Sequence, residues 1–149
     1  MGKKRIWNIL FILYCSVMLL LLFNRPGYIP GTPYWEQVRT NLNLVPFRTI
    51  KLYTGILADS KAHLSRIAKI NLYGNVIMFL PLGFLLPRVF SKLKGLASVL
   101  LATTGIIICV ELLQLFTLVG SCDVDDLILN VVGAAIGYLI FPIQNKGAA

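Results

Sequence analysis

Four long runs of apolar residues dominate the chain, at positions 6–23, 72–86, 96–116 and 127–143. A helix rises about 1.5 Å per residue, so about 20 residues cross the hydrocarbon core of a bilayer. The first and third runs are long enough alone, whereas the second and fourth need the polar residues that precede them at membrane depth. We therefore predict an all-α fold, a four-helix transmembrane bundle with helices at about 6–23, 71–90, 95–118 and 124–143.

The long segment at residues 24–70 separates the first two predicted helices and forms the first extracytoplasmic loop of this scheme. Residues 41–50 are predicted to be extended around their proline, because the residue before a proline avoids the helical region. Residues 59–70 have one apolar face and several bases, which predicts an amphipathic helix on the lipid surface with Asp59 or Ser60 as its N-cap.

Two glycines four residues apart, Gly133 and Gly137, predict a close approach of another helix to the fourth predicted helix. Pro81 removes one backbone hydrogen bond from the second helix and predicts a kink, which Gly83 would ease.

Composition supports the membrane interpretation. The 149 residues are enough for a single domain, 1–149, and they are 57% hydrophobic but only 13% charged. Soluble domains carry about 25% charged residues. The net charge of +8 comes largely from bases beside the apolar runs, where they face anionic lipid, so we expect no nucleic-acid partner. Six such bases are Lys3, Lys4, Arg5, Arg88, Lys92 and Lys94.

The bases also predict an orientation in the cell membrane. The amino terminus and the loop at 87–95 carry three bases each, whereas the loop at 117–126 carries none and has three aspartates. With the one base of the carboxyl tail, the predicted cytoplasmic side carries seven bases. Counting the seven bases of residues 24–70 makes the two sides equal, but long loops follow the positive-inside rule poorly. Weighting the short loops, we predict a multi-pass protein with both termini in the cytoplasm.

Polar residues interrupt the apolar runs mainly at one end of the predicted bundle. Glu111 and Gln114 are spaced i, i+3, and three polar residues at the start of the fourth helix follow i, i+3, i+7 spacing on one face. In this topology they meet at the outer leaflet with the start of the second helix. The candidate ligand-binding residues are Asn75, Glu111, Gln114, Asp123, Asp126 and Asn130.

Glu111 is the most informative of these residues. An acidic side chain deep in a membrane helix costs roughly 2.5–3.5 kcal/mol, so it needs water or a partner. Arg48, which follows the segment NLVPF, is our preferred partner and a further candidate site residue, because a guanidinium grips a carboxylate through two hydrogen bonds.

Purely structural roles remain alternatives for several polar residues. Asp123 would cap the fourth helix, Asn75 and Gln114 would hydrogen-bond between helices, and Asp125 would be solvated. The segment DVDD resembles a divalent-metal cluster. With no histidine nearby we expect no cofactor, and we keep a cation at Asp123, Asp125 and Asp126 as an alternative.

Four segments then resemble the VanZ-like family in order: NLVPFRTI, NVIMFLPLGFLLPR, ELLQLF and DVDDLILNVVGAAIGY, within residues 43–138. Two departures are Cys122, where an aromatic residue is common, and NVVG in place of NTLG. The resemblance implies a membrane protein, as found in Gram-positive bacteria, with a phenotype of reduced susceptibility to teicoplanin, and it does not imply a reaction. The matching positions are Pro46, Phe47, Asn75, Pro81, Gly83, Glu111, Gln114, Asp123, Asp125, Asp126, Asn130, Gly133 and Gly137.

Three functional hypotheses follow. The first is a cell-envelope protein without enzymatic activity that binds an amphiphile among the membrane lipids, either a lipid-linked wall precursor or a glycopeptide antibiotic. The second is an intramembrane hydrolase or transferase in which Glu111 is the buried carboxyl group and Asp126 the ionised one. The third is a small proton-coupled transporter, for which so few helices would require a homo-oligomer.

Overall fold

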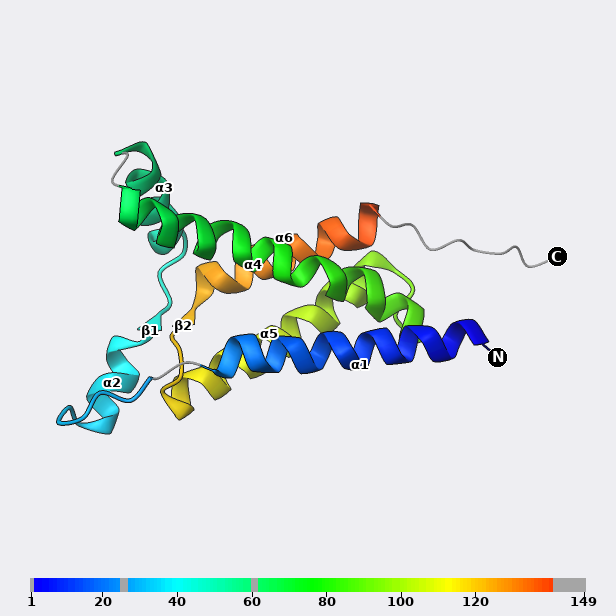
Figure 1. Cartoon of the computed structure of the whole chain (residues 1–149), viewed down its shortest axis with the longest axis horizontal. Coiled ribbons are helices and arrows are strands. Elements are labelled where there is room, and N and C mark those ends of the chain that lie inside the picture. Colours follow the sequence, from blue (N-terminus) through cyan, green and yellow to red (C-terminus); the bar gives the residue numbers. More distant parts are fainter. Residues whose placement is uncertain (1, 25–26, 60–61, 141–149) are drawn as a thin grey trace.

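The computed structural model describes residues 2–24, 27–59 and 62–140. Within them the chain is helical apart from one pair of short strands (Figure 1). The elements are α1 (Gly2–Phe23), α2 (Tyr34–Thr40), β1 (Leu42–Asn43), α3 (Arg48–Ala58), α4 (Ala62–Val89), α5 (Leu96–Thr117), β2 (Cys122–Asp123) and α6 (Val124–Ile140). The all-α prediction is confirmed.

Three of the described helices are long and apolar enough to cross a membrane: Gly2–Phe23, Leu64–Val89 and Leu96–Thr117. They correspond to the first three predicted spans. α6 has 17 described residues, and the last part of the predicted fourth span, 141–143, lies outside the described residues. Four spans therefore stay a prediction.

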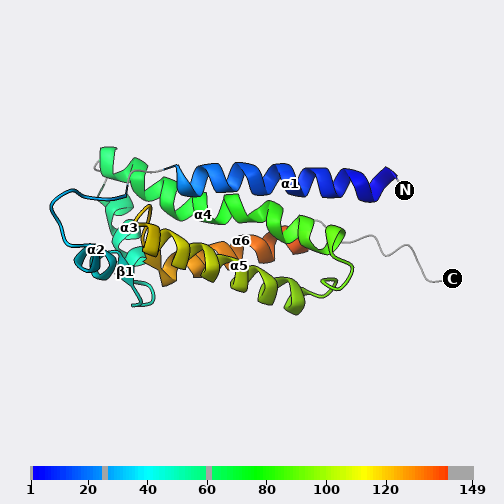
Figure 2. The same cartoon turned by 90° about the horizontal axis from the view of Figure 1, so that it is seen from below.

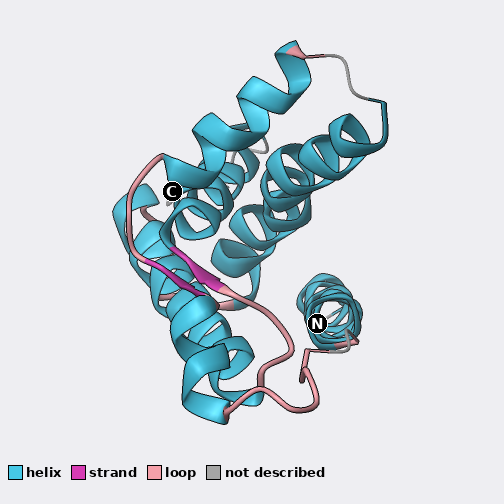
Figure 3. Cartoon of the chain, turned by 90° about the vertical axis from the view of Figure 1, so that its left-hand side faces the viewer, coloured by secondary structure: helices cyan, strands magenta, loops and turns pink. Residues whose placement is uncertain are grey.

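The four long helices lie alongside one another, with α1 and α5 running in one direction and α4 and α6 in the other (Figures 1 and 2). α2, β1 and α3 gather at the end where α4 and α6 begin. We call residues 27–59 the cap. Figure 3 views the molecule from this end and shows the two short strands side by side, with Leu42 paired to Cys122 and Asn43 to Asp123 in a parallel register.

The closest helix contact joins α4 to α6, and glycines make it possible. A Cβ atom added at Gly133 would lie 2.2 Å from the carbonyl oxygen of Val76, and one added at Gly137 would lie 2.0 Å from that of Leu80. On the facing helix, a Cβ atom at Gly83 would lie 1.8 Å from an α6 carbonyl oxygen. The predicted close approach at Gly133 and Gly137 is confirmed.

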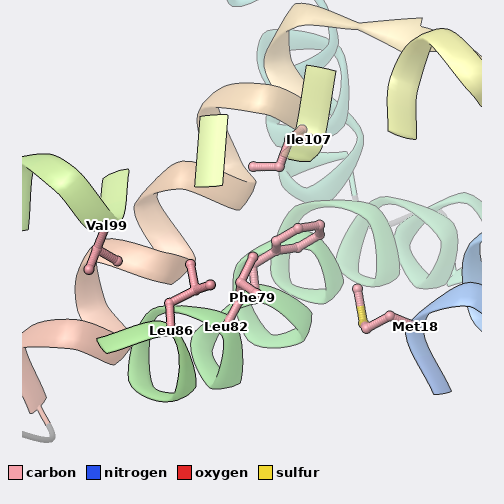
Figure 4. Close-up of a cluster of buried hydrophobic side chains, with 6 residues drawn as sticks. All are labelled: Met18, Phe79, Leu82, Leu86, Val99 and Ile107. Carbon is pink, nitrogen blue, oxygen red and sulfur yellow. The ribbon is translucent and has the colours of Figure 1, made fainter. Parts of the chain in front are cut away.

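Apolar side chains from three helices fill the interior between α1, α4 and α5 (Figure 4). The cluster comprises Met18, Phe79, Leu82, Leu86, Val99 and Ile107. Met18 is the one buried residue of α1. The Tyr14 hydroxyl, also on α1, donates a hydrogen bond of 2.9 Å to the Met78 carbonyl. Most of the apolar surface of α1 therefore faces away from the protein, as expected of a helix surrounded by lipid.

The structure differs from the predicted surface helix at 59–70. α3 ends at Ala58 with Asp59 as its C-cap, and α4 continues without interruption from Ala62 through Pro81 to Val89. No glycine or proline separates the predicted surface helix from the predicted second span, so nothing local ends it. Ser60, the other predicted cap, lies outside the described residues.

The prediction of an extended segment at 41–50 is correct only for its first part. β1 is extended, but α3 begins at Arg48, directly after Phe47 in the left-handed conformation at φ 63°. That helix has no side-chain cap from its own N-cap residue. Its first amides are satisfied from elsewhere in the chain, which local sequence patterns do not reveal.

Candidate functional site

Asp125 is the residue that satisfies the start of α3. Its side chain is fully buried, and its two carboxylate oxygens accept the backbone N–H groups of Phe47, Thr49 (2.7 Å) and Ile50 (3.0 Å). A carboxylate suits this position because helix N-termini carry unpaired donors and a partial positive charge. The predicted solvated role for Asp125 is wrong, and this residue instead joins the cap to α6.

Asp123 has two structural tasks. Its Oδ1 accepts the backbone N–H of Asp125 at 2.8 Å, so the predicted N-cap of α6 is present. The same carboxylate accepts hydrogen bonds from the Thr49 hydroxyl and from the Asn43 amide at 3.1 Å. The parallel pairing of β1 and β2 places Asn43 opposite Asp123, which explains this contact.

Glu111 lies beneath this network and is 7% exposed. Its Oε2 accepts the backbone N–H of Asp123 at 3.0 Å, so it orients the strand that leads into α6. The predicted pairing with Arg48 is absent: the Arg48 side chain is exposed, and no ion pair joins the two among the described residues.

The remaining candidate residues converge on one cavity of about 100 Å³ between α4, α5 and α6. Its polar side chains include five of the predicted site residues: Asn75, Glu111, Gln114, Asp126 and Asn130. Asn75 of α4 donates a hydrogen bond of 2.6 Å to Asp126 of α6, which joins two of the helices at the cavity. Asp123 and Arg48 are not among its lining residues.

Two amide side chains of the cavity differ in how they are satisfied. Gln114 donates to the Leu22 carbonyl at 2.9 Å and so also connects α5 to the end of α1. This is a hydrogen bond between helices, as the structural alternative for Gln114 predicted. Asn130 is 4% exposed, and its carbonyl oxygen has no hydrogen-bond donor. Buried polar atoms without partners are uncommon in folded proteins, which makes Asn130 a candidate ligand-binding residue.

An apolar groove of about 220 Å³ lies next to this cavity, between α5 and α6 and below the cap. Leu44, Ile108, Leu112 and Leu127 contribute to it, and Glu111 lines both the groove and the cavity. The site therefore combines a polar cavity and an apolar groove that share Glu111 as a lining residue.

Sequence reasoning missed Tyr53 of α3, which is half-buried beside the carboxylates. Burial, with a smaller contribution from Asp126 and Asp123, raises the pKa of the Tyr53 hydroxyl. Burial likewise raises the pKa of the Cys122 thiol, assisted by Glu111 and Asp123. Both groups therefore stay protonated over a wider pH range than when free in solution.

Sequence reasoning also missed Gln37 of α2, a buried side chain that organises the start of the cap. Its carbonyl oxygen accepts the Ile29 N–H at 2.8 Å, and its amide donates to the carbonyls of Ile29 and Thr32 at 3.1 and 2.8 Å. Nearby, the Tyr34 hydroxyl donates to the Phe116 carbonyl at 2.8 Å and fastens α2 to α5. A lone glutamine in a short helix gives no signal of such a role in sequence.

The aspartate cluster offers little to a metal ion. The carboxylates of Asp123 and Asp125 are already engaged by protein donors. Across the part of the chain that the structure describes, no group of three or more His, Cys, Asp and Glu side chains is arranged to hold a cation. The alternative of a divalent cation at Asp123, Asp125 and Asp126 gains no support from this geometry.

These features define a class: a small all-helical protein with helices of membrane-spanning length and buried polar side chains under a cap at one end. The family model described as VanZ/LLP1 matches residues 10–145, and the chain belongs to this family. It is 28% identical over 149 residues to Protein VanZ of Enterococcus faecium. The alignment covers 98% of this chain and 79% of that relative. No solved structure matches the chain. The predicted family resemblance is confirmed.

Proposed function

We propose that this chain is a multi-pass cell-envelope protein of the VanZ type that binds an amphiphile at the outer leaflet. The observation that carries the proposal is the polar cavity lined by Glu111 and by Asn130, whose buried carbonyl oxygen has no donor, with an apolar groove beside it that Glu111 also lines. In this proposal the head group enters the cavity while the hydrocarbon tail lies along the groove.

Energetics favour an occupied cavity. An acidic side chain at the centre of a membrane helix costs roughly 2.5–3.5 kcal/mol. Glu111 recovers part of this through one backbone amide, that of Asp123. A bound head group that donates hydrogen bonds would lower the remaining free-energy cost and so stabilise the Glu111 carboxylate in its apolar surroundings.

The membrane arrangement that we propose has α6 as a fourth span and the cap at the outer face. The loop between α4 and α5 carries Lys92 and Lys94, and it lies at the same end as the basic start of α1 (Figure 1). Positive short loops favour the cytoplasm. The cavity then opens near the outer leaflet, where lipid-linked wall precursors and lipid-tailed glycopeptides such as teicoplanin are met.

Lipid retention by Glu111→Ala tests this proposal. Lipids that co-purify with the wild type would be identified by mass spectrometry and compared with those retained by the variant. We expect Glu111→Ala to lose the characteristic lipid and to restore teicoplanin susceptibility in cells at equal protein levels. Glu36→Ala, which removes an exposed carboxylate on α2, is the matched control and should change neither result. Unchanged lipid retention and susceptibility in Glu111→Ala would overturn the proposal.

One observation favours a second candidate, an intramembrane hydrolase or transferase. Glu111 and Asp126 line the same cavity, and two carboxyl groups in different surroundings are able to act as acid and base. Conversion of the co-purifying lipid by the purified wild type, abolished by Asp126→Asn, would establish this activity. A lipid recovered intact after prolonged incubation would eliminate it.

A further inference from the structure

The cavity under the cap has an unusual balance of hydrogen-bonding groups. Its charged lining side chains, Glu111 and Asp126, are both carboxylates, and among the described residues that line it none is lysine, arginine or histidine. This contrasts with the whole chain, whose 14 bases outnumber its 6 acids. Among the described lining residues, the charged side chains are therefore acidic.

Two groups of the cavity lack sufficient donors. Glu111 accepts one hydrogen bond, from the Asp123 amide, although an ionised carboxylate accepts several. Among the described residues, the charged groups that act on it are the carboxylates of Asp126 and Asp123. The second group is the buried carbonyl oxygen of Asn130, on α6, which has no donor. Glu111 of α5 and Asn130 of α6 both line the cavity.

The chemistry of these acceptors selects the occupant. A primary ammonium group carries a positive charge and three N–H donors, so it can serve a carboxylate and a carbonyl oxygen together. A quaternary ammonium has the charge but no N–H, and a hydroxyl has a donor but no charge. Each satisfies only part of what Glu111 and Asn130 present.

We infer that the cavity binds the primary ammonium group of an amphiphile, with Glu111 as its counter-ion and Asn130 as a second acceptor. The inference rests on the proposed amphiphile-binding function and specifies which head groups it accepts. A phosphatidylethanolamine-type lipid and a soluble primary amine share this chemistry. Between these sources, attachment to a tail adds the apolar groove at Leu112 and Leu127 to the binding surface.

Lipid competition with the full-length protein tests the inference. Nanodiscs would hold equal amounts of phosphatidylethanolamine, phosphatidylcholine and phosphatidylglycerol with identical acyl chains, and the lipids retained after detergent extraction would be counted by native mass spectrometry. We expect about tenfold enrichment of the ethanolamine lipid over the choline lipid, which corresponds to about 1.4 kcal/mol. In Glu111→Gln, which preserves side-chain shape but removes the charge, enrichment should fall below about twofold.

Two further variants guard this test against simple misfolding. Asn130→Leu removes the second acceptor and should reduce the enrichment, whereas Glu36→Gln on exposed α2 should leave it unchanged. Elution of each variant as a single species by size-exclusion chromatography establishes that it is folded.

A second arm distinguishes the sources of the ammonium. Displacement of the retained lipid by free ethanolamine, but not by choline, supports recognition of the ammonium itself, as does binding of ethanolamine alone without lipid enrichment. Equal retention of the three lipids with no displacement by ethanolamine overturns the inference while leaving amphiphile binding intact. Retention of no lipid at all defeats the proposed function as well.

Discussion

Asp125 is the single residue on which the cap most depends, because it accepts three backbone amides from a segment more than 70 positions away in sequence. Asp125→Ala would leave these donors buried and unpaired at the start of α3. Each unsatisfied donor costs roughly 1–3 kcal/mol, so we expect a destabilisation of about 3 kcal/mol. The loss should be measured as faster proteolysis within residues 41–59 and a lower thermal midpoint in detergent.

The matched control for Asp125 is again an exposed carboxylate, Glu36 of α2, whose replacement by alanine should leave both measurements unchanged. Proteolysis of Asp125→Ala at the wild-type rate would show that the cap is held by its other contacts instead.

Cys122 offers a test of the electrostatics at the residue scale. Because burial, Glu111 and Asp123 raise the pKa of its thiol, less thiolate is present at any given pH, and alkylation should be slow. In protein carrying Cys15→Ser and Cys109→Ser, the midpoint of the alkylation rate against pH should lie above that of a small-molecule thiol.

An exposed position of the cap supplies the comparison. Thr40 is exposed, so Thr40→Cys combined with Cys122→Ser should react with a midpoint near that of the free thiol. Coincident pH profiles for positions 40 and 122 would contradict the charge distribution described here.

Among the helices, the α4–α6 contact is the most sensitive to substitution. A Cβ atom at Gly133 would lie 2.2 Å from a backbone oxygen of α4, which a small adjustment of side chains does not relieve. We expect Gly133→Ala to destabilise the protein by about 2–3 kcal/mol, in the upper range for an overpacked interior. The thermal midpoint in detergent and the yield of monodisperse protein measure this effect.

Gly105 of α5 is the control for that substitution, since an added Cβ atom there meets nothing within 4 Å. Alanine has a higher helix propensity than glycine by about 1 kcal/mol, so Gly105→Ala should be neutral or slightly stabilising. Equal effects of the two substitutions would mean that α4 and α6 do not pack as closely as described.

Sequence patterns predict these elements only where the governing interactions are local. The apolar runs locate α1, the membrane part of α4, α5 and the described part of α6, and the spacing of Gly133 and Gly137 identifies the packing face. The hydrogen bond by which Asp123 caps the start of α6 is local too, because its acceptor is two residues from the donor.

α2, α3 and the role of Asp125 escape prediction for the opposite reason. The start of α3 is capped by a carboxylate 75 or more positions away, and the strand pairing that brings it there involves only two residues on each side. Arg48 illustrates the same limit: its charge complements Glu111, but its place at the first turn of α3 leaves its side chain exposed. The shared depth of Asn75, Glu111 and Asp126 was predictable because each residue's distance along its own helix fixes it.

At the scale of the whole molecule, the distribution of bases predicts an orientation that labelling can test. Two exposed positions lie at opposite ends of the bundle: Ser91 between α4 and α5, and Thr40 at the end of α2 (Figure 1). Each would be replaced singly by cysteine. In a cysteine-free background we expect an impermeant maleimide to label Thr40→Cys in intact cells and Ser91→Cys only after permeabilisation. The reverse pattern would place the cavity on the cytoplasmic side and contradict the proposed outer-leaflet site.

Polar side chains of separate helices meet in one cavity, and cross-linking Asn75→Cys to Asp126→Cys in native membranes tests this arrangement most directly. The Asn75 amide lies 2.6 Å from the Asp126 carboxylate, so a short thiol-specific reagent should join this pair efficiently in a cysteine-free background. Asn75→Cys with Leu101→Cys, near the start of α5, should remain unlinked. Cross-linking of the 75–126 pair no better than that of the 75–101 pair would contradict the shared cavity.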